Sequence, residues 1–244
     1  MERTDVALPD DSHKAGTVKT MFSRIAGRYD LMNRLMTFGR DQAWHREVVR
    51  QAALPGGGRL LDIGSGTGGI VRTALMQDPA LSAVAADFTF EMMATGRAHH
   101  ARHLIQWCGA DALRLPFGDN TFDAVTSGYL IRNVVDIRQA FEEQRRVVRP
   151  GGKVVCLDTS PPPDGVLQPF INVYLETVIP LLGRLISGDR QAYRYLPEST
   201  QHFHTPDELR DFMHSAGLQN VTYRRLMHKT VVILHGTKPG KATT

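Results

Sequence analysis

The chain has 244 residues, a length that suits a single α/β domain with extensions, and its 42% hydrophobic and 22% charged residues are ordinary for a globular protein. The formal net charge is only +4 and the basic residues are scattered, which argues against a nucleic-acid-binding surface. The two cysteines, Cys108 and Cys156, lie in apolar runs without metal-ligand spacing, so we expect buried, reduced thiols and no metal site.

The N-terminal segment lacks the basic start and the apolar core of a signal peptide. The sequence also lacks a stretch of about 18 uncharged apolar residues, so we expect no membrane-spanning helix. These two observations favour a cytoplasmic protein.

Helical segments are predicted before the first strand. Four apolar residues recur at helical spacing between residues 17 and 28: Val18, Met21, Phe22 and Ile25. A second helix is expected at 41–53. The segment between them, which includes Tyr29, is rich in aromatic residues and methionine, so we interpret residues 1–57 as a helical lid over a ligand pocket. Coverage of one face of the sheet would explain the same apolar residues.

Strands and helices alternate over residues 58–159, the pattern of a parallel sheet with helices on both faces. The expected strands are 59–63, 82–87, 103–109, 122–128 and 153–158. The expected helices are 70–77, 91–101 and 137–148, the last of them ended by Arg149-Pro150-Gly151-Gly152. This region is therefore expected to be a ligand-binding core.

Residues 166–187 are unusually apolar, but Glu176, Arg184 and two prolines interrupt them. We therefore predict a broken helical insertion over 160–204. It either packs on the sheet edge or admits a long isoprenoid chain and touches a membrane surface.

A helix that starts near Thr205 and a terminal hairpin complete the domain over residues 205–238. Counting the hairpin, we expect seven strands. The chain is thus expected to form a single domain.

The most informative motif is a glycine loop at the end of the first strand, with the sequence Asp62-Ile-Gly64-Ser-Gly66-Thr67-Gly68. Such a loop exposes backbone N–H groups to an anionic ligand. Asp87, after the second strand, is placed to accept hydrogen bonds from a ribose diol. Because the glycine spacing departs from the dinucleotide pattern G-x-G-x-x-G, we favour S-adenosylmethionine over NAD as the ligand.

This succession of motifs resembles the class I S-adenosylmethionine-dependent methyltransferases. It is similar, more narrowly, to the ubiquinone and menaquinone biosynthesis C-methyltransferase family. The residues that carry this likeness are 18–33 (VKTMFSRIAGRYDLMN), 35–39, 61–68, 131–136 (IRNVVD), 157–161 and 193–199 (YRYLPES).

The likeness implies a Rossmann-like α/β fold with a seven-stranded, mostly parallel sheet. It also implies C-methylation of a polyprenylated quinol. Leu157-Asp158-Thr159-Ser160 is nearest to the demethylmenaquinone methyltransferases, so demethylmenaquinol is the expected substrate.

Three departures from the family pattern bear on this interpretation. Gly69 stands where the family usually has an acid, Tyr129-Leu130 replaces Phe-Gly, and Asp158 replaces a glutamate. The last two lie at strand ends, where a substrate would sit, so they affect substrate identity more than cofactor identity.

The resemblance assigns the glycine loop to the methionine end of the cofactor, Asp87 to its ribose, and Asp111 with Ala112 to its adenine. Asp111 also suits a turn-initiating role. The complete set of expected cofactor-binding residues is Asp62, Gly64, Gly66, Thr67, Gly68, Asp87, Phe88, Asp111, Ala112, Ser127 and Gly128.

Methyl transfer to a quinol carbon needs in-line alignment and an ionised neighbouring hydroxyl. Arg132 is expected to stabilise the phenolate, Asn133 to fix a ring oxygen or a water, and Tyr29 to close over the methyl group. Asp158 is the candidate base, although it also suits a turn-capping role. A surface ion pair between Arg132 and Asp136 is the alternative for the arginine.

Two histidines in the loop after the insertion, His202 and His204, are further candidates for substrate contact. The apolar insertion leads us to expect peripheral membrane contact and a homo-oligomer. Two other functions stay open: methylation of a soluble aromatic molecule, and a non-catalytic, cofactor-binding role in a quinone-making assembly. The lack of a basic stripe makes an RNA methyltransferase the weakest alternative.

Overall fold

The computed structural model describes residues 11–162, 165–166, 168–186, 189, 192–201 and 203–240. Seven strands form one sheet in the order β3-β2-β1-β4-β5-β7-β6. They are β1 (Arg59–Ile63), β2 (Ser82–Asp87), β3 (Ile105–Gly109), β4 (Phe122–Gly128), β5 (Val148–Thr159), β6 (Gln219–Leu226) and β7 (Val231–Thr237). The first five run parallel, and β7 lies antiparallel to both β5 and β6. This topology confirms the predicted fold class.

The strand order reverses between β1 and β4, so the carboxyl ends of these two strands border a crevice at the centre of the sheet. Both strands are almost wholly buried, as expected for parallel strands that are covered on both faces. The tertiary fold therefore puts the glycine loop after β1 beside the residues that follow β4.

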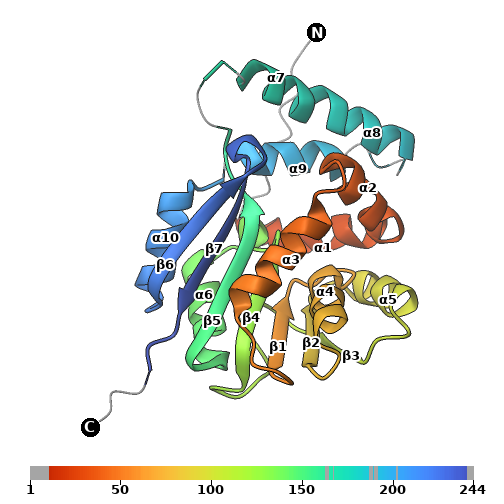
Figure 1. The fold of residues 1–244 in the computed structure, drawn as a ribbon. Helices are drawn as coiled ribbons and strands as arrows, with labels where there is room; N and C mark the ends of the chain where they lie inside the picture. Colours follow the sequence, from red (N-terminus) through yellow and green to blue (C-terminus); the bar gives the residue numbers. More distant parts are fainter. Residues whose placement is uncertain are drawn as a thin grey trace.

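Helices cover both faces of the sheet (Figure 1). On one face, α3 (Asp41–Ala52) and α4 (Gly69–Gln77) pack Trp44, Val48 and Val71 against it. On the other face, α6 (Ile137–Val147) and α10 (Pro206–Ser215) contribute Phe141, Leu209 and Met213. The helix α5 (Phe90–His99) contacts β2 and β3. The helix α3, which we predicted to be part of the lid, therefore covers one face of the sheet instead.

A helical cap lies over the carboxyl ends of the parallel strands (Figure 1). It consists of α1 (Asp11–Ile25), α2 (Tyr29–Met36), α7 (Gln168–Val173), α8 (Ile179–Ile186) and α9 (Ala192–Gln201). Met21 and Met32 from the first two helices share a buried cluster with Leu175, Ile179 and Tyr193. The cap therefore joins the predicted lid to the predicted insertion, two segments far apart in sequence.

Within the insertion, residues 168–186 form one continuous helix rather than the broken helix we predicted, and α9 is a separate helix. A π-helical turn, Tyr174–Val178, connects α7 and α8 without a break. Pro169 lies in the first turn, where its missing N–H costs nothing, and the wider π turn immediately before Pro180 accommodates the second proline. By length and composition alone, Gln168–Ile186 is one helix among the described residues that could cross a membrane, contrary to our expectation, although most of it is exposed.

Several further elements differ from those predicted, among them α2 and β5. The helix α2 was not predicted, because it spans only eight residues directly after a 3-10 turn. The strand β5 starts at Val148, ahead of the Pro150-Gly151-Gly152 stop signal. That signal ends α6, but Gly151 and Gly152 still exchange backbone hydrogen bonds with Lys238 and so extend the sheet.

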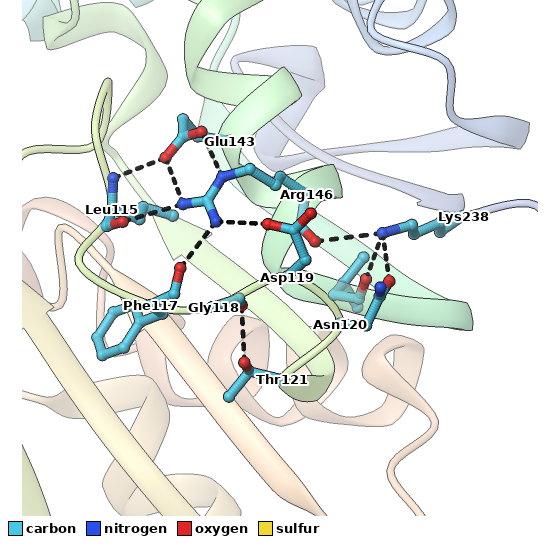
Figure 2. A network of polar contacts seen from close by, with 10 residues as sticks. Leu115, Phe117, Gly118, Asp119, Asn120, Thr121, Glu143, Arg146 and Lys238 are labelled. Carbon is cyan, nitrogen blue, oxygen red and sulfur yellow. Dashed lines mark hydrogen bonds and ion pairs between the residues drawn. The ribbon is translucent and has the colours of Figure 1, made fainter.

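A polar network ties the opposite end of the sheet together (Figure 2). Arg146, at the end of α6, donates to the carbonyls of Leu115 and Phe117 at 2.9 and 2.7 Å. Lys238, after β7, donates to the side chain of Asn120 at 2.7 Å and to the carbonyl of Arg146 at 3.2 Å. These bonds fix the turn before β4. Because this turn lies at the end of the sheet opposite the cap, we assign the network a structural role.

Candidate functional site

The glycine loop after β1 depends on left-handed backbone that favours glycine. Gly64, Gly66 and Gly68 have φ values of 62°, 57° and 82°. A Cβ at Gly68 would lie 2.8 Å from the Trp107 ring, so this glycine allows close packing. Gly68 lines none of the three cavities described below, so its contact with a cofactor stays a prediction.

Three cavities meet above this loop. The strand-end cavity, about 250 Å³, is lined by predicted cofactor residues that include Gly66, Asp87, Phe88, Asp111 and Ala112. The polar cavity, about 170 Å³, is lined by Asp62, Gly64, Thr67 and further polar side chains such as His45 and Arg72. The apolar cavity, about 320 Å³, lies against the cap and includes Met36, Trp44, Ile179 and Arg132 in its lining.

Three residues line all of these cavities: Tyr29, Asn33 and Tyr129. Gly128 lines both the strand-end and the polar cavity. A ligand that occupies the first two cavities would therefore meet a ligand in the apolar cavity at the two tyrosine rings. The sequence predicted Tyr29 for this position and missed Asn33 and Tyr129 as site residues.

Two buried carboxylates face the loop. Asp87 accepts hydrogen bonds from the backbone N–H groups of Gly66 and Thr89, both at 2.7 Å, which leaves further lone pairs for a ligand. Burial raises its pKa and these N–H groups oppose the rise. Asp62 accepts from Thr126 at 2.7 Å through Oδ1, while Oδ2 has no partner among the described residues. Burial raises the pKa of Asp62 to about 7.

The remaining predicted cofactor residues differ in whether they line a cavity. Asp111 lines the strand-end cavity and also accepts the N–H of Leu113 at 2.9 Å, so the turn-forming alternative is correct as well. Phe88 lies under the Lys19 ammonium group, which is 4.9 Å from its ring centre. Thr67 donates to Asp30 of α2 at 2.5 Å and so connects the loop to the cap. Ser127 is fully buried within β4 and lines none of the three cavities, so its cofactor contact stays a prediction.

Arg132 forms a buried ion pair with Asp158 at the ends of β4 and β5. Its Nη1 lies 3.0 Å from Oδ1 of the carboxylate, which also accepts the backbone N–H groups of Arg132 and Thr159 at 3.2 and 2.8 Å. The predicted surface pair with Asp136 is wrong, because Asp136 caps α6 by accepting the N–H of Gln139. The arginine lines the apolar cavity.

Asp158 is not placed to act as a base. It is fully buried, lines none of the three cavities and uses both oxygens for Arg132 and backbone N–H groups. Burial raises its pKa, and the Arg132 guanidinium opposes that rise. Its strand-end position suggested contact with a ligand, but only the tertiary pairing shows that it orients Arg132.

Tyr129 has a φ of 58°, which is uncommon for an aromatic residue. Its N–H donates to Leu157 at 2.7 Å, and its carbonyl accepts from the Asn133 side chain at 2.9 Å. The Arg132 guanidinium lies 5.1 Å from the centre of its ring. Backbone strain held in place by surrounding contacts is typical of functional sites. Asn133 thus fixes this turn, and its Oδ1 accepts from Tyr195 at 3.3 Å.

An aromatic pair forms part of the wall of the apolar cavity. Phe38 stacks on Tyr174 with ring centres 5.5 Å apart, and the Tyr174 hydroxyl donates to the Met36 carbonyl at 2.8 Å. His204 lies away from this cavity, against Glu208 and Phe212, so its predicted role is not supported. His202 lies outside the described residues.

Comparison with known proteins decides the family. Residues 10–238 match the model of the ubiE/COQ5 methyltransferase family, which is most of the chain. The chain belongs to this family. It is therefore an S-adenosylmethionine-dependent methyltransferase, as the resemblance predicted.

Curated relatives from the ubiE/COQ5 family are similar in sequence to this chain over almost their whole lengths. The chain is 45% identical to the ubiquinone/menaquinone biosynthesis C-methyltransferase UbiE of Desulfotalea psychrophila, with 92% of each chain covered. It is 43% identical to the demethylmenaquinone methyltransferase of Roseiflexus castenholzii, with 96% of this chain and 98% of the relative covered. The corresponding enzyme of Thermus thermophilus is also 43% identical, with 90% of this chain and all of the relative covered.

Solved structures share the fold at much lower identity. A phosphoethanolamine N-methyltransferase of Haemonchus contortus in complex with S-adenosyl-L-methionine has a TM-score of 0.61 and 16% identity, with 81% of this chain and 52% of that chain covered. The [4+2]-cyclase SpnF has a TM-score of 0.68 and 15% identity, with 93% and 96% covered. Because a cyclase shares the fold, the fold alone does not determine the reaction.

Proposed function

We propose that this member of the ubiE/COQ5 family transfers a methyl group from S-adenosylmethionine to a ring carbon of a polyprenylated quinol, demethylmenaquinol. One observation carries the proposal. The strand-end and polar cavities above the glycine loop meet the apolar cavity at Tyr29, Asn33 and Tyr129, and Arg132 of the buried ion pair lines the apolar cavity. This arrangement suits a charged methyl donor opposite a large apolar acceptor.

The residues of the strand-end and polar cavities fit S-adenosylmethionine. The unpartnered Oδ2 of Asp62 suits the ammonium group of the methionine end, and the backbone N–H groups of the loop suit its carboxylate. Asp87 suits the ribose hydroxyls, while Asp111, Ala112 and Phe88 border the space for the adenine. When bound, the cofactor supplies an electrophilic methyl group.

The chain's own residues then align and activate the acceptor. Arg132 is held by Asp158 so that a permanent positive charge borders the apolar cavity, where it stabilises a phenolate oxygen. Its Nε is buried and has no partner among the described residues. Tyr29 and Tyr129 restrict the passage between the cavities, which excludes water and limits the approach of the acceptor.

The substrate assignment rests on chemistry and on the relatives. The apolar cavity suits an aromatic ring with a hydrocarbon tail, and the Roseiflexus and Thermus relatives are named demethylmenaquinone methyltransferases. Two departures from the family pattern, Tyr129 and Asp158, lie at strand ends and are compatible with this assignment. The tyrosine retains an aromatic ring, and the aspartate still pairs with Arg132.

The same proposal includes contact with a membrane surface, where a polyprenylated substrate resides. Several apolar side chains of the cap helices and of the turn after α2 are exposed: Leu31, Leu35, Phe38, Phe170, Val173, Leu181 and Leu185. Phe38 and Phe170 also line the apolar cavity, so a tail that leaves the cavity between them would enter lipid directly. We therefore place the enzyme at the membrane surface in the cell, with the cap facing the lipid. A homo-oligomer that buries the same side chains is the competing arrangement.

A methyl-transfer assay with labelled S-adenosylmethionine and reduced, short-tailed demethylmenaquinol tests the proposal. The wild-type protein should label the quinol. Asp87→Ala should lose both cofactor binding and turnover, whereas Arg132→Ala should keep cofactor binding and lose turnover by at least about 100-fold.

The control is Asp78→Ala, which changes a carboxylate that contacts the loop before β1, at Gly57, and lies outside the cavities. Cofactor binding without turnover on any quinol would contradict the proposal and favour the non-catalytic function. Turnover on soluble aromatic acceptors alone would favour the other-substrate alternative.

A further inference from the structure

The turn between β6 and β7 contains three consecutive non-glycine residues with left-handed backbone. Met227, His228 and Lys229 have φ values of 44°, 52° and 70°. A run of this kind is strained and persists only where its surroundings hold it in place. Thr230 donates twice to the Met227 carbonyl, at 3.1 Å from its N–H and 2.7 Å from its hydroxyl, and Ser160 donates to the Thr230 carbonyl at 2.8 Å.

This turn borders the apolar cavity. His228 lines the cavity beside Met227, Thr230 and Val231, and it is exposed, so it also reaches solvent. Val231 pairs with Thr159 of β5, whose hydroxyl accepts from Arg132 Nη1 at 3.3 Å. The turn and the Arg132 guanidinium therefore border the same cavity at the same edge of the sheet.

Few side chains at this cavity can accept a proton. The ionisable residues among its described lining are Tyr29, Tyr129, Tyr174, Arg132 and His228. Burial raises the pKa of all three tyrosines, so their phenols keep their protons. A guanidinium has no acceptor lone pair. A neutral imidazole, in contrast, has one ring nitrogen with a free lone pair that can accept a proton.

We propose that His228 is the proton acceptor for the quinol hydroxyl next to the methylated carbon, an inference that rests on the proposed function. The O–H bond breaks, its proton passes to an imidazole nitrogen, and the electron pair stays on the oxygen beside Arg132. The ring carbon then bonds to the methyl group while the S–C bond breaks, and sulfur keeps that electron pair. The ring C–H proton then passes to water, which restores the aromatic ring as a phenolate, and the imidazolium returns its proton to that oxygen, so that one proton is released overall.

Other charged groups surround the turn and must be separated from His228 in a pH profile. They are Lys229 within the turn, Arg224 and Arg225 on β6, His235 on β7 and Arg132 across the cavity. Burial lowers the pKa of His235, and this residue contacts Thr222 at 3.0 Å, away from the cavity. Lys229 lies outside the cavity lining, which makes Lys229→Gln the matched control for the turn.

The test compares His228→Gln, His228→Gly and Lys229→Gln in methyl transfer to short-tailed demethylmenaquinol between pH 5.5 and 9.5. We expect both His228 variants to lose about 100-fold in kcat at pH 7 with little change in KM, the size expected for a lost general base. Their kcat should rise steadily with hydroxide concentration, whereas the wild-type profile levels off. Because glycine favours left-handed backbone, His228→Gly should melt no lower than the wild type, and added imidazole should restore part of its activity.

Several outcomes overturn the inference. A kcat for His228→Gln close to that of the wild type with an unchanged pH profile would exclude His228 alone and leave the proposed function intact. An equal loss in Lys229→Gln, without imidazole rescue of His228→Gly, would assign the effect to the turn. Absence of wild-type turnover despite cofactor binding would overturn the proposed function and this inference together.

Discussion

At the scale of single residues, Asp62 connects cofactor binding to pH. Its pKa of about 7 follows from burial, and an adjacent ammonium group requires the ionised form. A proton must therefore leave when the cofactor binds below pH 7. We expect S-adenosylmethionine affinity to fall by up to about tenfold per pH unit below 7 and to stay level above it.

Calorimetric titration at several pH values in buffers of different ionisation enthalpy measures this proton release. Asp62→Asn should bind S-adenosylmethionine more weakly, with no such proton release.

Because the folded protein holds the Asp62 proton more tightly than the unfolded chain, the contribution of Asp62 to stability is complete below the unfolded pKa of 3.8 and lost as pH rises through 7. Asp62→Asn should remove that decline, and a pH-independent affinity in the wild type would contradict the assignment.

The Arg132–Asp158 pair allows structure and chemistry to be separated. Both side chains are buried, so Asp158→Asn leaves an uncompensated guanidinium and should lower the free energy of unfolding by about 3–5 kcal/mol. The double variant Arg132→Met with Asp158→Leu should recover much of that loss, because it removes both charges. It should nevertheless stay inactive if Arg132 stabilises the phenolate. Denaturant titrations and kcat values measure the two effects, and an active double variant would contradict the role of the arginine.

At the scale of elements, the cap helix 168–186 should bind lipid through its exposed side chains. Phe170 and Leu185 are each 72% exposed, and full burial of such a side chain contributes roughly 1.5–3 kcal/mol. We expect Phe170→Ser with Leu185→Ser to reduce binding to vesicles of phosphatidylcholine and phosphatidylglycerol by at least about tenfold.

The control is Leu104→Ser, a 91% exposed leucine next to β3 and outside the cap. Vesicle sedimentation and kinetics with long- and short-tailed quinols measure the effect. Only the KM for the long-tailed quinol should rise. An equal loss in the Leu104 variant, or no loss in the double variant, would exclude the cap as the lipid-binding surface.

At the scale of the whole molecule, the proposed cofactor site lies between two bodies, the sheet core and the cap. Contacts that join them include the Thr67–Asp30 hydrogen bond and a bond of 2.9 Å from the Lys14 ammonium group to the Val134 carbonyl. The strand-end cavity is lined by Val18 and Phe22 of α1 as well as by core residues. A ligand in this cavity therefore stabilises the cap together with the core.

We expect S-adenosylhomocysteine to slow amide hydrogen exchange in α1 and α2 more than in α6. A ligand at 100 times its Kd also adds about 2.7 kcal/mol to the free energy of unfolding. Mass spectrometry of exchange and a melting curve measure the two effects. Slower exchange confined to the core, with the cap unaffected, would show that the cap does not close over the cofactor.

Local sequence patterns were sufficient for most of the core. Apolar runs and turn residues located β1, β2 and β4 at their observed bounds, because strand formation in a parallel sheet depends on continuous apolar sequence. The glycine loop and the acid after β2 were located by spacing alone. Helix α2 and the continuous cap helix were missed, since a short helix has little periodicity and a π turn has no sequence signature we could use.

The sequence by itself determined the sheet, the glycine loop and the family of this protein, because each is encoded by neighbouring residues. Only the tertiary structure decided which side chains act together. Asp158 lies 26 residues from Arg132, and His228 reaches the same cavity from a hairpin almost 100 residues further along the chain. No local pattern records such pairings, because they arise from the order in which the strands are assembled and from the crossing of the cap over their ends.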